Sequence, residues 1–221
     1  MKKLLLSTVL ALGITSAAQA ETFTMTDFSV VGGVNVTFGP PLNESVQAGQ
    51  IALTGPGGNL LVWCLDLNDI LTKPYTFNVN TFTAGDIRPG LGQLSLLDGS
   101  ALRQIASLML NGIGFQDDGL SRAATQLAIW KIEYGALFDP LNLSAQLTAD
   151  MNAHILASVI GGLIDAPNAT LKVLTDAPIE PNQALGFAVV SEVPIPGAIW
   201  LFGGGLAGMV AMTRRRKRIA A

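Results

Sequence analysis

The alternation of hydrophobic and polar positions predicts a β-rich first part of the chain. Apolar and polar residues alternate, or β-forming residues dominate, in short runs at residues 23–26 and 34–38. Glycine and proline breakers such as Gly39-Pro40-Pro41 separate these runs. A further strand is predicted at residues 50–53. The stretch from residue 21 to about residue 80 is therefore expected to consist of strands and turns.

A longer apolar run at residues 60–67 follows. It is nearly all apolar, which is typical of a strand that is buried on both faces. It contains the only cysteine of the chain, Cys64, within Trp63-Cys64-Leu65-Asp66. The pattern therefore predicts a buried strand around Cys64.

From about Ala101 the hydrophobic period changes to that of a helix. A first helix is predicted to end at Asn111-Gly112, because apolar residues recur at helical spacing before it: Leu102, Ile105, Leu108 and Met109. A second helix is predicted over residues 120–134, with Gly135 as a left-handed cap. Its segment 123–130 is apolar nearly all round, which predicts a helix packed in the interior.

A third helix and two closing strands complete the predicted domain. The helix is expected to run from Ser144, a candidate N-cap, to Ile160, and Gly161-Gly162 should end it. Residues 170–174 and 184–190 are predicted strands. A chain of 221 residues suits one domain plus targeting segments. The predicted fold class is therefore α+β, a β-rich domain with a helical insert of about three helices.

Residues 1–20 have the three parts of a secretory signal peptide. Lys2 and Lys3 form a positive start, residues 4–14 form an apolar segment, and Ala18-Gln19-Ala20 is a small-x-small cleavage site. We therefore expect signal peptidase to cut after this site and the body of the chain, residues 21–192, to leave the cytosol as one globular domain.

Residues 193–221 carry a second three-part pattern. The motif Val193-Pro194-Ile195-Pro196 precedes an uncharged apolar stretch at residues 197–213, and a basic tail, residues 214–221, follows. The uncharged run from Pro194 to Thr213 is about 20 residues long, roughly what a helix needs to cross a hydrocarbon core of ~30 Å, so a transmembrane helix is predicted over residues 197–213. The prolines keep that helix from extending backwards. The cations of the tail should stay cytoplasmic, because positive charge is retained on that side.

This C-terminal pattern resembles the PEP-CTERM sorting signal of Gram-negative bacteria, in the variant that has an apolar residue between the prolines. Ile195 stands where the commonest form of the motif has glutamate. The resemblance implies that an exosortase recognises residues 193–196 and processes the protein at the inner membrane. The protein would then reach the cell surface or the extracellular matrix. The alternative is an ordinary C-terminal membrane anchor that is not cleaved.

The charge of the body restricts its partners. Without Lys2, Lys3 and the five cations of the tail, six basic residues remain against 16 acidic ones, which gives the body a net charge of −10. Nucleic acids and anionic lipid surfaces bind proteins through basic patches. The body is therefore not expected to bind nucleic acid, and no cofactor is expected.

The single cysteine needs an explanation, because an exported protein meets oxidising conditions. It cannot form a disulfide within the chain. Four possibilities are open for Cys64: a buried inert thiol, a disulfide with a second chain, a nucleophile, or another covalent bond.

Two short motifs favour the last possibility. Trp63-Cys64-Leu65-Asp66 and Thr125-Gln126-Leu127-Ala128-Ile129-Trp130 together resemble the thioester domain of bacterial surface adhesins. The resemblance implies that the Cys64 sulfur displaces ammonia from the Gln126 amide, and that the resulting thioester then acylates an amine on a neighbouring surface.

The remaining residues of the two motifs would surround that bond. Trp63, Ile129 and Trp130 would shield it from water, and Asp66 would orient groups nearby, while Thr125 belongs to the helical motif. The alternative is that Cys64 is a core residue beside a helix that merely packs against it.

Other chemistry has less support. The chain has one histidine, His154, and no Gly-x-Ser-x-Gly motif, so a hydrolase is not expected. Calcium could bind at Asp117-Asp118 or at Asp66 and Asp69, but neither pair has EF-hand spacing, and no metal site is expected. The prediction is therefore a non-enzymatic surface or matrix protein that can attach covalently. The alternative is a noncovalent structural or binding module with an inert cysteine.

Overall fold

The computed structural model describes residues 21–67, 69–87, 91–111, 119–159, 169–175 and 183–190. The predicted signal peptide, proline motif, transmembrane helix and basic tail lie outside these residues, and so do Asp117-Asp118 and Gly161-Gly162. Among the described helices, none combines the length and the apolar character that a membrane crossing requires.

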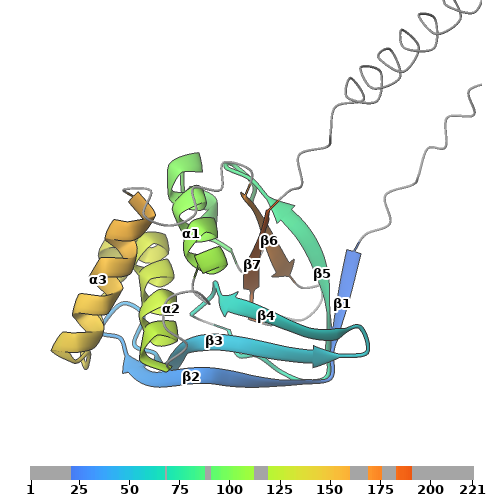
Figure 1. The fold of residues 1–221 in the computed structure, drawn as a ribbon, viewed down its shortest axis with the longest axis horizontal. Helices are drawn as coiled ribbons and strands as arrows, with labels where there is room; N and C mark the ends of the chain where they lie inside the picture. The colour runs from blue at the N-terminus through green and yellow to red at the C-terminus, as the bar shows by residue number, and fades with distance from the viewer. Residues whose placement is uncertain are drawn as a thin grey trace, which may run out of the picture.

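The described strands form one antiparallel sheet of seven strands in the order β1-β5-β6-β7-β4-β3-β2. The last two strands therefore enter the middle of the sheet, between β5 and β4. The sheet is bent, since β2, β3 and β4 run across the view while β6 and β7 stand nearly upright (Figure 1). The strands are β1 Glu21–Met25, β2 Asp27–Thr37, β3 Ser45–Gly55, β4 Gly58–Cys64, β5 Tyr75–Phe82, β6 Ala169–Thr175 and β7 Leu185–Val190.

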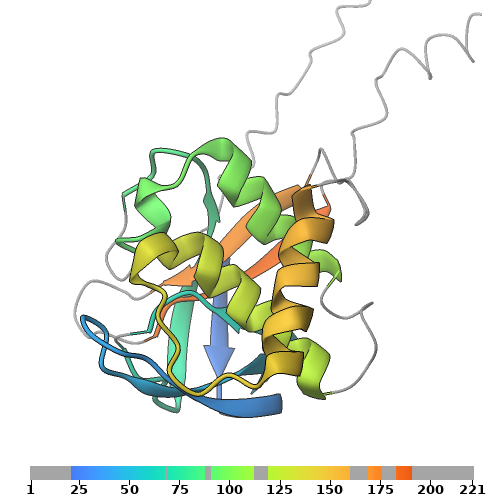
Figure 2. The ribbon, with the colours of Figure 1, turned by 90° about the vertical axis from the view of Figure 1, so that its left-hand side faces the viewer.

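The three helices lie in the angle of the bent sheet (Figures 1 and 2). They are α1 Gly99–Asn111, α2 Gly119–Tyr134 and α3 Ala145–Val159, and two short 3₁₀ turns, η1 Leu94–Leu96 and η2 Gly135–Leu137, flank them. Helix α1 packs on β6 and β7, whereas α2 packs on β2 and β3 and is covered by α3. The predicted α+β class with a three-helix insert is confirmed for the described residues.

Local sequence explains where the helices begin and end. The Asp98 carboxylate accepts hydrogen bonds from the backbone N–H groups of Ser100 and Ala101, which caps α1. The Ser144 hydroxyl oxygen accepts one from the Leu147 N–H at 3.2 Å, as expected for the N-cap of α3. Gly135 has a φ of 54°, so α2 ends in the left-handed conformation that glycine tolerates.

Helix α2 is the interior helix of the fold. Every residue from 123 to 130 is buried, as the apolar pattern predicts. Its start lies against a bulge of β2, where the backbones of Gly32 and Gly119 are in direct contact. A Cβ atom on Gly32 would lie 2.4 Å from the Cα atom of Gly119, so only glycine fits there.

The strand predicted at residues 60–67 requires a correction. Strand β4 begins at Gly58 and ends at Cys64, and it forms a hairpin with β3 through the turn at residues 55–58. The hairpin extends beyond the helices, so Leu61 is 39% exposed, and continuous burial begins only at Val62. Strand β5 is not among the runs singled out in the sequence.

Candidate functional site around Cys64

Cys64 is the last residue of β4, and its register with β7 decides what lies beside it. Cys64 pairs with Leu185, and the Leu65 N–H donates to the Ala184 carbonyl at 2.9 Å. Because the two strands are antiparallel, Gln183 lies beside the chain as it leaves β4. The Cys64 side chain is 3% exposed, so this site is in the core.

Gln183 reaches the sulfur of Cys64. Its amide Nε2 lies 3.0 Å from Cys64 Sγ and also donates to the Asp66 backbone carbonyl at 3.0 Å. The Cys64 thiol donates to the same carbonyl at 2.9 Å. The thiol and the amide of Gln183 are therefore held together by one shared acceptor.

Gln126 reaches the main chain of Cys64 instead. Its Oε1 accepts from the Cys64 N–H at 3.0 Å, and its Nε2 donates to the Cys64 carbonyl at 2.9 Å. The indole Nε1 of Trp130 donates to the same carbonyl at 3.1 Å. Both polar ends of the Gln126 amide are thus engaged by backbone groups, and neither has a hydrogen bond to the sulfur among the described contacts.

The Cys64 thiol is in an environment that opposes its ionisation. Burial raises its pKa far above the ordinary range, and the charges of Glu133 and Asp66 add to this effect. The hydrogen bond to the Asp66 carbonyl acts in the other direction but does not offset burial. A free thiol at this position is therefore protonated and weakly reactive.

Two further side chains of α2 close the site. The Tyr134 hydroxyl accepts a hydrogen bond from the Leu67 N–H at 3.0 Å. Glu133 is 4% exposed, and neither of its carboxyl oxygens has a hydrogen-bond partner in the described part of the chain. Burial, together with the charge of Asp66, raises the pKa of Glu133 well above its usual value.

Thr125, next to Gln126, connects α2 to α3. Its hydroxyl donates to the Ser121 carbonyl at 3.0 Å, and its oxygen lies 3.1 Å from His154 Nδ1. A hydroxyl has one proton, so the pair requires His154 Nδ1 to carry the other. Burial lowers the pKa of His154, and the charge of Asp150 opposes that shift. His154 is thus part of a helix–helix contact.

Some of the other predicted site residues are in the described part of the chain, and the rest are outside it. Trp63, Ile129 and Trp130 are almost completely buried, Trp130 contacts the Cys64 carbonyl, and Asp66 is 4% exposed. The predicted sorting motif, Val193-Pro194-Ile195-Pro196, and the predicted cleavage residues Ala18 and Ala20 are outside the described residues. In the described ranges no three His, Cys, Asp or Glu side chains are grouped so as to hold a metal ion.

The sequence interpretation missed Gln183. The residue stands directly before a predicted strand, where nothing in the local pattern indicates chemistry. Its position beside Cys64 follows from the pairing of β4 with β7, which joins residues about 120 positions apart. Glu133 could have been found, since it lies seven residues after Gln126 on a helix and therefore on the same face.

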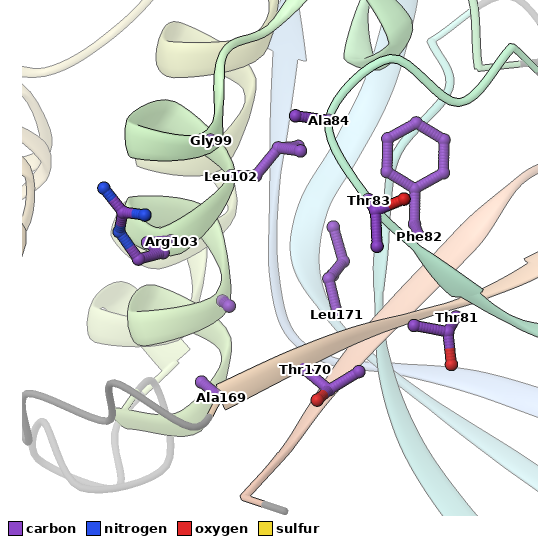
Figure 3. Close-up of a pocket in the computed structure, with 11 residues that line it drawn as sticks. Thr81, Phe82, Thr83, Ala84, Gly99, Leu102, Arg103, Ala169, Thr170 and Leu171 are labelled. Carbon is purple, nitrogen blue, oxygen red and sulfur yellow. The ribbon is translucent and has the colours of Figure 1, made fainter.

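A separate pocket lies between the start of α1, the end of β5 and the start of β6 (Figure 3). Leu102, Phe82 and Leu171 provide apolar walls, and Thr81, Thr83 and Thr170 provide hydroxyl groups. None of the residues that surround Cys64 lines this pocket.

Two solved structures are similar to the chain. One is a cysteine mutant of the N-terminal thioester domain of a surface protein from Clostridium perfringens, with 18% identity over 64% of this chain and 88% of that chain and a TM-score of 0.47. The other is the N-terminal thioester domain of a protein F2-like fibronectin-binding protein from Streptococcus pneumoniae, with 10% identity over 77% and 93% of the two chains and a TM-score of 0.41. No family model and no curated protein sequence matches the chain. These similarities are low, and the function proposed below rests on the geometry around Cys64.

Proposed function

We propose that the exported body of this protein is a non-enzymatic surface or matrix module that attaches covalently to an amine on a neighbouring surface. The attachment uses an internal thioester between Cys64 and Gln183. The observation that carries the proposal is the 3.0 Å distance between Cys64 Sγ and Gln183 Nε2. In this proposal Gln126 holds the main chain of Cys64 and does not supply the acyl group.

The thioester forms without an external reagent. The Cys64 sulfur adds to Cδ of Gln183, the bond from Cδ to the amide nitrogen breaks, and the thiol proton leaves with that nitrogen as ammonia. An amine then attacks Cδ, the bond from Cδ to sulfur breaks, and a substituted amide forms. The amine nitrogen loses one proton and the sulfur takes one up, so that the Cys64 thiol is restored.

Burial of the sulfur and partial exposure of the amide support this chemistry. Cys64 is 3% exposed and Trp130, which hydrogen-bonds its carbonyl, is 1% exposed, so water is kept from the sulfur side of the bond. Gln183 is only half-buried, at the start of the last strand. The amine is therefore proposed to approach from the side of Gln183, which is the less buried of the two residues.

Processing at the two ends would deliver the module to its place of action. The proposal includes signal peptidase at residues 18–20 and an exosortase at residues 193–196, in a Gram-negative bacterium. The protein would be anchored in the inner membrane before processing and would then reach the cell surface or the matrix. If removal of residues 193–221 leaves processing and surface delivery unchanged, the sorting proposal is wrong.

A noncovalent structural or binding module is the second candidate. It is favoured by the raised pKa of the Cys64 thiol, which keeps the reactive thiolate scarce. In that case the contact between Gln183 and Cys64 is a hydrogen bond within a packed core and nothing more.

Intact mass of the exported, unreduced protein separates the two candidates. A thioester lowers the mass by one ammonia, and this loss should disappear in Cys64→Ala. A full mass in fresh wild-type protein, together with complete alkylation of Cys64 after unfolding, would support the noncovalent module.

Trapping with an amine identifies the acyl donor without a mutation. Methylamine opens the thioester and leaves an N-methylated glutamine at the donor position. Peptide mapping should find this group on Gln183. A label on Gln126 would overturn the assignment of the donor but not the thioester itself.

A further inference from the structure

Glu133 is a buried carboxyl group without a hydrogen-bond partner. It is 4% exposed, and both of its carboxyl oxygens are without partners in the described part of the chain. A buried polar group that makes no hydrogen bond is a cost to the fold, and such exceptions often have a functional reason. The position of Glu133 in the molecule indicates what that reason is.

Helix α2 presents Glu133 to the chain around Cys64. Gln126, Trp130 and Glu133 are spaced four and three residues apart, which puts them on one face of the helix. The first two hydrogen-bond the Cys64 carbonyl, and the next residue along, Tyr134, hydrogen-bonds the Leu67 N–H. Glu133 therefore faces the segment between Cys64 and Leu67.

Burial is the main cause of the raised pKa of both groups. The charge of Glu133 adds to the rise in the pKa of the Cys64 thiol, and the charge of Asp66 adds to the rise in the pKa of Glu133. The raised pKa means that Glu133 keeps its proton to a higher pH than an exposed glutamate does. A thiolate expelled from a thioester at Cys64 would be costly in the same environment, because burial opposes that charge too.

We propose that Glu133 donates a proton to the Cys64 sulfur when an amine opens the thioester. This inference rests on the proposed function. As the bond from Gln183 Cδ to the sulfur breaks, the Glu133 carboxyl gives its proton to the departing sulfur. The attacking nitrogen loses one proton, which returns to the Glu133 carboxylate, so the carboxyl is regenerated. General acids act in direct contact or through one water molecule. Neither Glu133 oxygen has a hydrogen-bond partner among the described residues, so the proton passes to the sulfur through one water molecule.

The groups that face Glu133 are few. Asp66 and Cys64 face it from the end of β4, and Tyr134 neighbours it on α2. Among the described residues of β2, β3, α1 and α3, none contributes a charge to its shift. A pH profile should therefore report the titration of Glu133 coupled to Asp66.

The test uses protein that is expressed from the full chain and purified after export. Intact mass must first show that this protein has lost ammonia. Methoxyamine is the probe, because this weakly basic amine is neutral at neutral pH and above, so its own protonation does not change the rate there. Its rate of reaction with the thioester is followed by mass for wild type and Glu133→Gln. We expect Glu133→Gln to react about 100-fold more slowly, the usual lower size of general-acid assistance. The wild-type rate should also fall as the pH rises through the pKa of Glu133, and the variant should lack this fall.

Three further variants separate proton donation from a structural role. Glu44→Gln makes the same chemical change at a half-buried position directly before β3 and should react like wild type. Glu133→Asp keeps a carboxyl and should restore part of the rate. Glu133→Met removes the unpartnered group, and should unfold at a higher temperature than wild type while it reacts as slowly as Glu133→Gln.

The outcomes distinguish this inference from the function on which it rests. Wild-type protein without ammonia loss would overturn the thioester and the role of Glu133 together. Wild-type protein with a thioester, and a Glu133→Gln variant with the same rate and pH profile, would overturn the role of Glu133 alone. If no Glu133 variant folds while Glu44→Gln does, Glu133 is a structural residue and the inference is wrong.

Discussion

Two glutamine side chains reach Cys64 from two different elements, and they contact different parts of it. Gln126, on α2, is fully buried and binds the backbone N–H and carbonyl of Cys64. Gln183, just before β7, is half-buried and binds the sulfur. The amide of Gln126 thus stabilises the fold, whereas in our proposal the amide of Gln183 is the one that reacts.

The pairing of β3 with β4 ends before Cys64, which explains why Gln126 is needed as a hydrogen-bond partner for the Cys64 backbone. Pairing of β4 with β3 stops at Val62, which pairs with Ile51, while pairing with β7 continues on the other side to Cys64. Backbone groups of alternate residues point to opposite sides of a strand, so the Cys64 N–H and carbonyl face the side where β3 has ended. Gln126 and Trp130 satisfy these groups in place of a strand.

The largest effect is expected when the buried member of the pair is truncated. Gln126→Ala leaves a cavity and an unsatisfied Cys64 N–H, and should lower the free energy of unfolding by about 4 kcal/mol. Gln183→Ala is the matched change; both changes are made in a Cys64→Ala background, which cannot form the thioester, and there Gln183→Ala should cost less than about 1 kcal/mol because the side chain is half-buried. Urea unfolding measures both. Equal losses in the two variants would contradict the division of roles.

Gly32 on β2 lies against the start of α2, so a change there should disturb the contact of Gln126 with Cys64 and leave that of Gln183 in place. Gly32 has a φ of 67°, and a Cβ there would lie 2.4 Å from the Gly119 Cα, so Gly32→Ala must displace the start of α2. We expect a loss of about 3 kcal/mol in the free energy of unfolding.

Gly57→Ala is the control for this change, since no atom lies within 4 Å of a Cβ at that position. It should leave stability unchanged within about 0.5 kcal/mol. The folded Gly32→Ala protein should keep most of its thioester, measured as ammonia loss, although its free energy of unfolding is lower. The reason is that Gln183 is positioned by the sheet. Full loss of the thioester in a variant that still folds would show that the position of α2 governs the sulfur as well.

A smaller effect is expected at the second donor to the Cys64 carbonyl. Trp130→Phe removes the indole N–H but keeps an aromatic ring edge-on to Phe38, whose ring centroid lies 5.9 Å from that of Trp130. The carbonyl retains the Gln126 Nε2 donor, so the loss should be about 1 kcal/mol in urea unfolding. A loss as large as that of Gln126→Ala would mean that Trp130 is the main support of the Cys64 backbone.

Local pattern was sufficient to predict the elements near the site but not their arrangement. The apolar run at residues 123–130 identified an interior helix, and Ser144 and Gly135 identified helix ends, because burial and capping depend on neighbouring residues. The strand order could not be predicted in this way. The insertion of β7 beside β4 depends on which long-range pairing buries more apolar surface.

The same distinction applies to the site. The motifs at residues 63–66 and 125–130 pointed to a contact between a strand cysteine and a helix glutamine, and the structure places Gln126 on Cys64. A motif does not specify whether a side chain meets the sulfur or the main chain. That outcome depends on where β3 stops pairing with β4, and Gln183 is beside the sulfur only because of the register between β4 and β7.

The smallest expected effect is a pH dependence of the free energy of unfolding. It arises at His154, which contacts α2 next to Gln126. Burial lowers the pKa of His154 from its usual 6.5, so the unfolded chain binds a proton before the folded one does. The free energy of unfolding should therefore decrease as the pH falls below about 6.5, until the lower pKa of the folded state is reached. His154→Gln should remove this part of the decrease. Asp150→Asn should enlarge it, because the Asp150 charge opposes the shift. His154 contacts Thr125, the neighbour of Gln126 on α2. The extent of ammonia loss at Gln183 should therefore stay constant over the same pH range. If the ammonia loss decreases together with the free energy of unfolding, Gln126 and Gln183 do not support Cys64 independently.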